Sequence, residues 1–241
     1  MQTYTGIVSF FQDGGPFMVP IVVVLALGLA IVIERWLYLQ GTDLRNRALW
    51  KRITPHLQRG DFDAAAREAN ASKAALGSVL GYGLSRVRTA RRRDDIEKAM
   101  EESLMEVMPK LEKRTHYLAT FANVATLLGL LGTIIGLIRA FTAVAGANPA
   151  DKADLLSASI SVAMNTTAFG LMVAIPLLLA HTLLQTRTTE IVDGLEMASV
   201  KLLNAVTERR GTPDGGAAAA AKPAPARRGS GPAPGAPAVA T

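Results

Sequence analysis

Three long apolar runs dominate the pattern of hydrophobic and polar positions along the chain. The first covers residues 16–39 and has no charged side chain before Glu34, and the others cover residues 117–146 and 157–186. At a rise of about 1.5 Å per residue, each run is long enough as a helix to cross a hydrocarbon core of about 30 Å. The sequence therefore predicts an all-α membrane protein with three transmembrane helices.

The polar segments between the runs predict the orientation of the chain. Residues 40–116 are rich in Lys and Arg, whereas residues 1–15 contain neither. Because basic residues remain on the cytoplasmic side, we expect residues 1–15 and the short link 147–156 to face away from the cytoplasm and the C-terminus to face it. No basic residue precedes the first run, which therefore predicts a retained anchor and not a cleaved signal peptide.

Helical periodicity continues outside the apolar runs. Two stretches of residues 40–116, DFDAAAREANAS and DDIEKAMEESLMEVMPKLEKRTHYL, predict amphipathic helices. We expect the second to continue into the second span as one long helix, with a kink at Pro109. Residues 187–210 predict a further cytoplasmic helix, and the Ala-, Pro- and Gly-rich residues 211–241 predict a disordered tail. The cytoplasmic helices are either simply solvated or form a vestibule shared among subunits, and the pattern leaves both interpretations open.

Small residues gather on one face of the second span and one face of the third. At about 100° per residue, the residues that share these faces include Gly129, Gly132, Thr133 and Gly136, and Thr167, Gly170 and His181. Small residues let helices approach closely in lipid, so a helix-packing seam explains the glycines. The two threonines admit a further interpretation.

Thr133 and Thr167 are predicted to lie at similar depth. Thr133 is 13 residues before Gly146 and Thr167 is 10 residues after residue 157, so helical rise places both roughly 15 to 20 Å from the same surface. We interpret two hydroxyls at one depth as a polar lining; the simpler alternative is that each threonine bonds to its own helix. No acidic residue lies at that level, although ion relays across a bilayer use ionisable residues. An ion pathway would therefore need a carboxylate from a partner helix.

Composition narrows the chemistry further. The chain of 241 residues is 49% hydrophobic and has no Cys and only three His, so we expect neither a disulfide framework nor a metal site. Its net charge of +6 is attributed to basic residues that flank membrane spans, not to nucleic-acid binding. Because Ser157, Ser159 and Ser161 have no neighbouring general base and no Gly-rich phosphate loop occurs, we expect no enzymatic activity and no cofactor.

Three stretches resemble the signatures of the MotA/TolQ/ExbB proton-channel family: GLLGTIIGLIRAF (129–141), NTTAFGLMVAIPLLL (165–179) and GGPFMVPI (14–21). The three-span layout is similar to the TolQ/ExbB branch. The resemblance implies a bacterial inner-membrane protein that forms a homopentamer around a dimer of a single-span, ExbD/TolR-like partner. The intramembrane Asp of that partner would carry protons.

The resemblance also implies roles for individual residues. Thr133 and Thr167 correspond to pore-lining threonines, and we include the neighbouring Thr166 in the predicted ion pathway. The residues expected to pack around this pathway are Gly129, Gly132, Gly136, Gly170 and Pro176. One position departs from the family, whose members often have a glutamate five residues before the third-span threonine, where this chain has Val162.

These observations predict an ion-channel subunit, with protons as the expected ion, of a motor that uses the proton motive force to do mechanical work on the cell envelope or outer membrane. The alternative is a non-conducting membrane scaffold in a transport or secretion complex. An independent secondary transporter is disfavoured because the chain has neither an internal repeat nor a charged substrate site. His181 is interpreted either as a residue at the headgroup level or as a proton exit.

Overall fold

Six helices make up the part of the chain that the structure, a computed structural model, describes: residues 15–90 and 92–211. They are α2 (Met18–Arg59), α3 (Phe62–Ala71), α4 (Ala75–Arg86), α5 (Arg93–Glu112), α6 (Thr115–Ala145) and α7 (Lys152–Gly211). The described residues contain no strand, and the predicted all-α class is confirmed. The predicted N-terminal segment (1–15) and disordered tail (211–241) lie outside the described residues, apart from Gly15 and Gly211.

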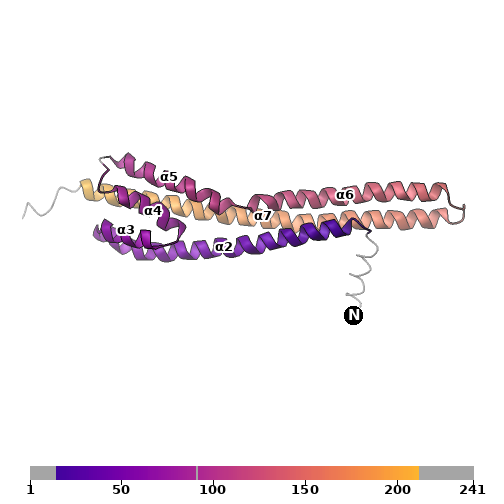
Figure 1. Ribbon diagram of the computed structural model, residues 1–241, viewed down its shortest axis with the longest axis horizontal. Coiled ribbons are helices and arrows are strands. Elements are labelled where there is room, and N and C mark those ends of the chain that lie inside the picture. Colours follow the sequence, from indigo (N-terminus) through magenta and orange to yellow (C-terminus); the bar gives the residue numbers. More distant parts are fainter. Residues whose placement is uncertain (1–14, 91, 212–241) are drawn as a thin grey trace, which may run out of the picture.

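The molecule is elongated, and α7 extends along nearly its whole length (Figure 1). Helices α2, α5 and α6 lie beside α7. We call the end at which α3, α4 and α5 gather the charged end, and the end with the α6–α7 turn the hairpin end. Helix α2 begins well short of the hairpin end, so the last part of the α6/α7 hairpin extends beyond it (Figure 1).

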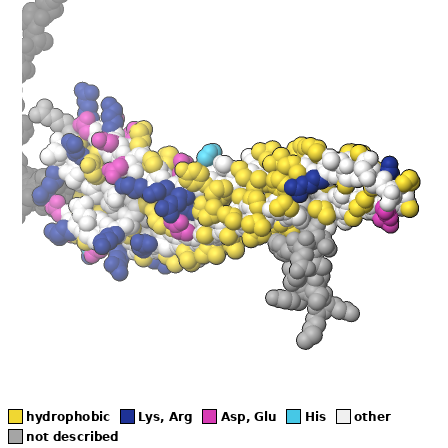
Figure 2. Space-filling view, turned by 45° about the vertical axis from the view of Figure 1, so that its right-hand side comes forward, with side chains coloured by type: hydrophobic (Ala, Val, Ile, Leu, Met, Phe, Trp, Pro, Cys, Tyr) yellow, Lys and Arg dark blue, Asp and Glu magenta, His cyan; other side chains and the backbone are white. Residues whose placement is uncertain are grey.

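Exposed apolar side chains form a belt around the middle of the molecule. They belong to residues 19–38 of α2, 117–141 of α6 and 164–183 of α7, and Figure 2 shows them as a continuous yellow surface beside the charged end. Helix α2, the unit formed by α5 and α6, and α7 are each long and apolar enough to cross a membrane. An apolar surface of this extent is typical of contact with lipid.

Helix α2 continues for some twenty residues beyond the predicted span. This extension buries Asn46, Leu49, Ile53 and Leu57 and ends at Gly60, whose left-handed backbone (φ 77°) closes the helix with hydrogen bonds to two preceding carbonyls. Asp61 then accepts a hydrogen bond from the backbone N–H of Ala64 at 3.0 Å and so caps α3. The chain thereby reverses at the charged end.

Sequence analysis missed helix α4. It has three glycines, which lower helix propensity, and its sequence ALGSVLGYGLSR lacks the polar face of an amphipathic helix. Most of the helix is buried, and a Cβ on Gly77 would lie 2.7 Å from the carbonyl oxygen of Ala69 in α3. Close packing between backbones therefore selects glycine here and overrides its weak propensity.

The prediction of one long helix through Pro109 into the second span was wrong. Pro109 lies inside α5, and the chain breaks after it, at Lys113 and Arg114. Arg114 adopts a left-handed backbone with φ 66°, a conformation that disfavours non-glycine residues. Two neighbouring residues of α2 stabilise the break. Glu34 accepts a hydrogen bond from Arg114 at 2.6 Å, and Arg35 binds residues on both sides of the break.

Candidate ion-pathway site on the α6/α7 hairpin

The glycines of the two small faces pack directly against each other within one chain. A Cβ on Gly170 would lie 2.7 Å from the Ala125 carbonyl oxygen and 3.1 Å from the Cα of Gly129. On Gly136, a Cβ would lie 2.8 Å from that of Ala163. Glycine is required along this seam because any larger residue would force the α6 and α7 backbones apart. We call these contacts the glycine seam.

The glycine seam sets the antiparallel register of the hairpin. Gly129 faces Thr167 and Gly170, Gly132 faces Thr166, and Gly136 faces Ala163. In this register Thr133 lies opposite residue 165 or 166, so its offset from Thr167 along the hairpin axis is at most about 3 Å by helical rise. The packing is therefore consistent with two hydroxyls at similar depth.

The hydroxyls of Thr133 and Thr167 bond to successive carbonyls of α6. Thr167 donates across the seam to the carbonyl oxygen of Gly129 at 2.9 Å, and Thr133 donates to that of Leu130, in its own helix, at 2.6 Å. Both side chains are half-buried. With each hydroxyl hydrogen engaged, each oxygen still has lone-pair capacity to accept a hydrogen bond from a further group.

Thr166 points in a different direction from its neighbour. It is buried against Gly132 and donates to the carbonyl oxygen of Val162, one turn earlier in α7, at 2.9 Å. Residues one apart on a helix lie about 100° apart around its axis, which explains why Thr166 packs into the seam while Thr167 stays at its edge. The structure thus separates the three threonines of the predicted pathway into one buried residue and two half-buried ones.

A small cavity lies at the start of α2, against the glycine seam. Its volume is about 210 Å³. The residues that line it are Gly15, Pro16, Phe17, Gly132, Ile135, Gly136, Arg139, Ser159, Val162 and Thr166. Val162, the position at which the sequence departs from the family pattern, therefore faces the turn at Gly15 and Pro16 that precedes α2. A Cβ on Gly15 would lie 3.3 Å from the Val162 side chain.

The remaining predicted residues, Pro176 and His181, lie outside this cluster. Pro176 is exposed in the interior of an unbroken α7, where proline leaves the carbonyl four residues earlier without its helical donor. His181 is half-buried, and the hairpin register places it opposite Tyr117, about 3 Å by helical rise from the start of α6. His181 is therefore far from the threonines and close to the charged end of the belt.

Sequence analysis also missed the buried arginine at that boundary. Arg35 is 4% exposed; its Nε donates to the Thr115 hydroxyl at 3.2 Å, and its Nη2 donates to the carbonyl oxygen of Leu111. Its guanidinium lies 5.1 Å from the centre of the Tyr38 ring. One side chain of α2 thus binds the last turn of α5 and the first turn of α6. The signal in the sequence was an arginine at the end of an apolar run, which also fits a residue at the headgroup level.

Acidic residues are absent from the hairpin at the level of the threonines. Helix α6 contains no Asp or Glu, and in α7 none occurs between Asp154 and Glu190. In the described part of α2 the first acidic residue is Glu34, at the far side of the belt from Thr133. Together with the half-buried Asn165, the two hydroxyls therefore provide polar side chains in an otherwise apolar section without acidic residues.

Comparison with known protein families matches residues 71–197 to the MotA/TolQ/ExbB proton channel family. The match covers α4 through most of α7, including the whole hairpin. The chain belongs to the MotA/TolQ/ExbB family. The family is described as one of proton channels and not of enzymes. With three helices that are long and apolar enough to cross a membrane, the chain is a multi-pass membrane protein.

Individual relatives point to the TolQ and ExbB members. The chain is 36% identical over 94 residues to the Tol-Pal system protein TolQ of Haemophilus influenzae, which covers 39% of this chain and 41% of that protein. It is 26% identical over 193 residues to a putative biopolymer transport protein ExbB homolog of Methanothermobacter thermautotrophicus, and the aligned region covers 79% of this chain and 67% of that protein. It is 28% identical over 167 residues to an ExbB-like protein of Synechocystis, and the aligned region covers 69% of this chain and 79% of that protein. The similarity to TolQ thus spans less than half of that relative.

Proposed function

We propose that this chain is the proton-conducting subunit of an inner-membrane motor, assembled as a pentamer around a dimer of a single-span, ExbD/TolR-like partner. The motor would convert the proton motive force into mechanical work on the cell envelope or outer membrane. The observation that carries the proposal is the Thr133 and Thr167 pair, two half-buried hydroxyls at similar depth in a section of the hairpin without a carboxylate. Family membership supports it independently.

In the proposed orientation the charged end lies in the cytoplasm and the hairpin end in the periplasm, as the positive-inside rule favours. The level of Arg35 and Thr115, next to Trp36 and Tyr38, is the inner boundary of the membrane, because aromatic and basic residues concentrate there. A core of about 30 Å measured from Thr115 ends near residue 135 of α6. Thr133 therefore lies close to the periplasmic surface, nearer than a count from the hairpin turn suggests.

The chemistry follows from how the hydroxyls are engaged. Because Thr133 and Thr167 direct their hydrogens to carbonyls of α6, their oxygens are free to accept a hydrogen bond. A protonated carboxyl group from the partner is a donor and would bind this arrangement directly. After losing its proton the carboxylate is only an acceptor, so it would have to leave or the hydroxyls would have to rotate. The hydroxyl pair thus distinguishes the two protonation states.

A non-conducting scaffold is the second candidate, and one observation favours it. Within a single subunit the threonine hydroxyls already have backbone acceptors, and the glycine seam is explained by helix packing alone. Nothing in an isolated chain therefore requires conduction. The two functions differ in what they require of the hydroxyl oxygen, because packing needs only the shape of the side chain.

Isosteric substitution tests this difference. Thr133→Val and Thr167→Val keep the shape of the side chain and remove the hydroxyl, whereas the matched Thr→Ser variants keep the hydroxyl and remove a methyl group. Each variant is reconstituted in proteoliposomes with an ExbD/TolR-like partner, and proton flux is measured with a pH-sensitive dye. We expect the Val variants to assemble, as judged by native mass spectrometry, and to lose proton flux, while the Ser variants retain it. Full proton flux in both Val variants would refute the role of the two hydroxyls in conduction, and absence of proton flux in the wild-type complex would refute the conducting function itself.

A further inference from the structure

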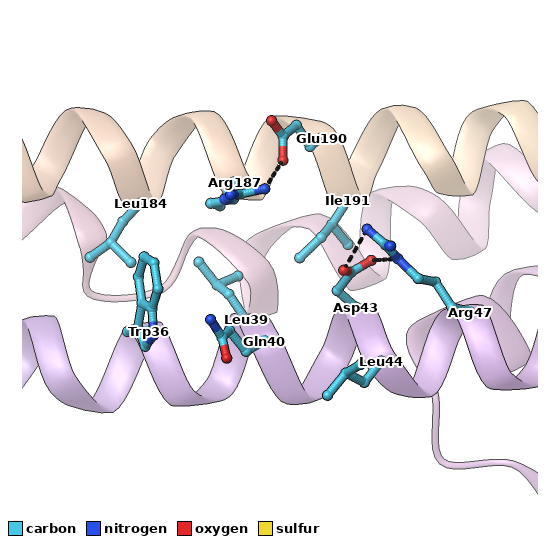
Figure 3. Close-up of a pocket in the computed structure, with 10 residues that line it drawn as sticks. All are labelled: Trp36, Leu39, Gln40, Asp43, Leu44, Arg47, Leu184, Arg187, Glu190 and Ile191. Carbon is cyan, nitrogen blue, oxygen red and sulfur yellow. Dashed lines mark hydrogen bonds and ion pairs between the residues drawn. The ribbon is translucent and has the colours of Figure 1, made fainter.

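A long open groove runs between α2 and α7 at the charged end of the molecule. Figure 3 shows its first section, where side chains from the two helices line a depression of about 360 Å³. Trp36, Leu39, Leu44, Leu184 and Ile191 provide its apolar surface. A second section of about 480 Å³ continues to Trp50, Leu195 and Lys201. We call the two sections together the α2/α7 groove.

The α2/α7 groove combines apolar surface with unpaired positive charge. Leu44 and Met197, which line it, are among the most exposed large apolar side chains outside the belt. Arg47 and Arg187 at its rim are each paired with a carboxylate of the same helix (Figure 3). In contrast, neither Lys51 nor Lys201 is in an ion pair with any residue that the structure describes. The groove is therefore suited to an apolar residue flanked by acidic ones.

The outward face of α5 has that chemistry. Ile96, Met100 and Val107 are buried on one side of α5, and Met105 lies on the opposite side. Met105 is 70% exposed, more than any other large apolar side chain in the described part of the chain. Glu101 lies one turn before it and is exposed. We call this the α5 outer face; its residues are Asp94, Lys98, Glu101, Met105 and Glu112.

The α5 outer face and the α2/α7 groove lie at the same height along the molecule. Glu101 and Leu104 of α5 share a pocket with Ser199 and Val200 of the antiparallel α7, so each step forward in α5 corresponds to a step backward in α7. This register places Met105 level with Leu195, in the groove, and Glu101 level with residue 199, within about 3 Å by helical rise of Lys201. Lys201 is itself packed on Trp50 of α2, at 5.7 Å from the ring centre.

Equal height matters because of symmetry. A ring of identical subunits in a membrane has its axis along the membrane normal, so every residue keeps its height from one subunit to the next. Two different faces at one height can bind head to tail and close such a ring. Faces at different heights cannot, because each added subunit would be displaced along the axis.

We propose that the α2/α7 groove is a docking surface for the α5 outer face of a second copy of this chain. Met105 of one copy lies on the apolar surface near Leu195 of the next, and Glu101 approaches Lys201. The proposal rests on the pentamer of the proposed function and assigns one of its subunit contacts. Helix α5 joins α6 through a break held by Arg35, so the docking would also connect the hairpin of one subunit to α2 of its neighbour.

Disulfide cross-linking tests the contact, and the chain has no Cys to interfere. Gly194 lines the groove, and a Cβ there would meet nothing within 4 Å. We expect the double variant Met105→Cys and Gly194→Cys, oxidised in membranes, to give a ladder of covalent oligomers on denaturing gels. The control pair combines Met105→Cys with Gln58→Cys, which lines the same side of the molecule but lies roughly 18 Å away in height. It should give monomers only.

Charge exchange supplies a second measurement. Lys201→Glu and Glu101→Lys should each reduce the fraction of pentamer in native mass spectra, and the double variant should restore it. An intact pentamer in both single variants overturns the proposal, and so does a cross-link confined to one chain. Protection of Gly194→Cys from a thiol reagent only when the single-span partner is co-expressed overturns it as well, because the partner would then occupy the groove.

The cross-link is read without proton flux, so this inference and the proposed function can fail separately. A ladder without flux would leave the docking surface in place and remove the channel. Flux without a ladder would remove the docking surface alone.

Discussion

The glycine seam makes a quantitative prediction about two glycines of the same helix. Gly170→Ala adds a Cβ that would lie 2.7 Å from a backbone oxygen of α6, whereas Gly194→Ala adds one that meets nothing within 4 Å. Both substitutions gain the same helix propensity, about 0.8 to 1 kcal/mol. The difference in unfolding free energy between the two variants therefore isolates the effect of close packing at Gly170.

The magnitude of that difference follows from the contact. Carbon atoms pack without repulsion at about 3.5 Å or more, so α6 and α7 must separate by several tenths of an ångström along the seam. Overpacking of this kind typically costs about 1 to 3 kcal/mol. At about 1.4 kcal/mol per factor of ten, Gly170→Ala should shift the folding equilibrium by roughly 5-fold to 150-fold against the folded state, relative to Gly194→Ala.

The measurement is equilibrium unfolding of dissociated subunits in mixed detergent micelles with increasing sodium dodecyl sulfate. The fluorescence of Trp36 and Trp50, which line the α2/α7 groove, reports the transition. We expect Gly194→Ala to match or exceed the wild-type midpoint and Gly170→Ala to fall below it. Equal midpoints for the two variants would refute the reasoning, because they would mean that α6 and α7 do not approach as closely as the seam requires.

Two further predictions concern the joint between α5 and α6. Arg35→Gln removes a buried charged donor from the Leu111 carbonyl and should lower the unfolding free energy by about 1.5 to 3 kcal/mol. The control Lys110→Gln disrupts an exposed ion pair and should change the unfolding free energy by less than about 1 kcal/mol. Equal losses for the two variants in the same detergent titration would contradict the stabilising role of Arg35 at this joint. Arg114→Gly relieves a left-handed backbone, worth about 1 to 2 kcal/mol, and loses an exposed pair with Glu34, worth about 0 to 1 kcal/mol. It should be at least as stable as wild type, and a clear loss would show that the pair with Glu34 outweighs the backbone.

Much of the fold could be predicted from local patterns. Apolar runs long enough to cross a membrane identify α2, α6 and α7, and the periodicity of Ile96, Met100 and Val107 identifies α5, because both signals reside within one helix. The break between α5 and α6 could not be predicted in this way. It depends on Glu34 and Arg35, some 80 residues earlier in the chain, and a local pattern contains no information about that contact.

In the candidate site, too, features set by local pattern could be predicted from the sequence, and features set by packing could not. The similar depth of Thr133 and Thr167 could be predicted because a short link forces the two spans to run antiparallel from a common turn, and the contacts of the glycine seam agree with it. The direction in which each hydroxyl donates its hydrogen bond could not be predicted. Whether Thr167 donates to its own helix or to Gly129 depends on how closely the backbones approach, which only the packed hairpin determines. The burial of Thr166 has the same origin.

Packing and conduction are not independent properties of this hairpin. Thr167 reaches the carbonyl of Gly129 only because glycine at residues 129 and 170 lets the two backbones meet. A larger residue in the seam would lengthen that hydrogen bond and free the hydroxyl hydrogen, and it would therefore change the acceptor surface offered to a carboxyl group. Gly170→Ala is therefore expected to lose stability whether the chain is a channel or a scaffold, so loss of proton flux in this variant does not show that the hydroxyls take part in conduction. The isosteric Thr→Val variants leave the backbone distance unchanged, and they therefore test the hydroxyls without disturbing the glycine seam.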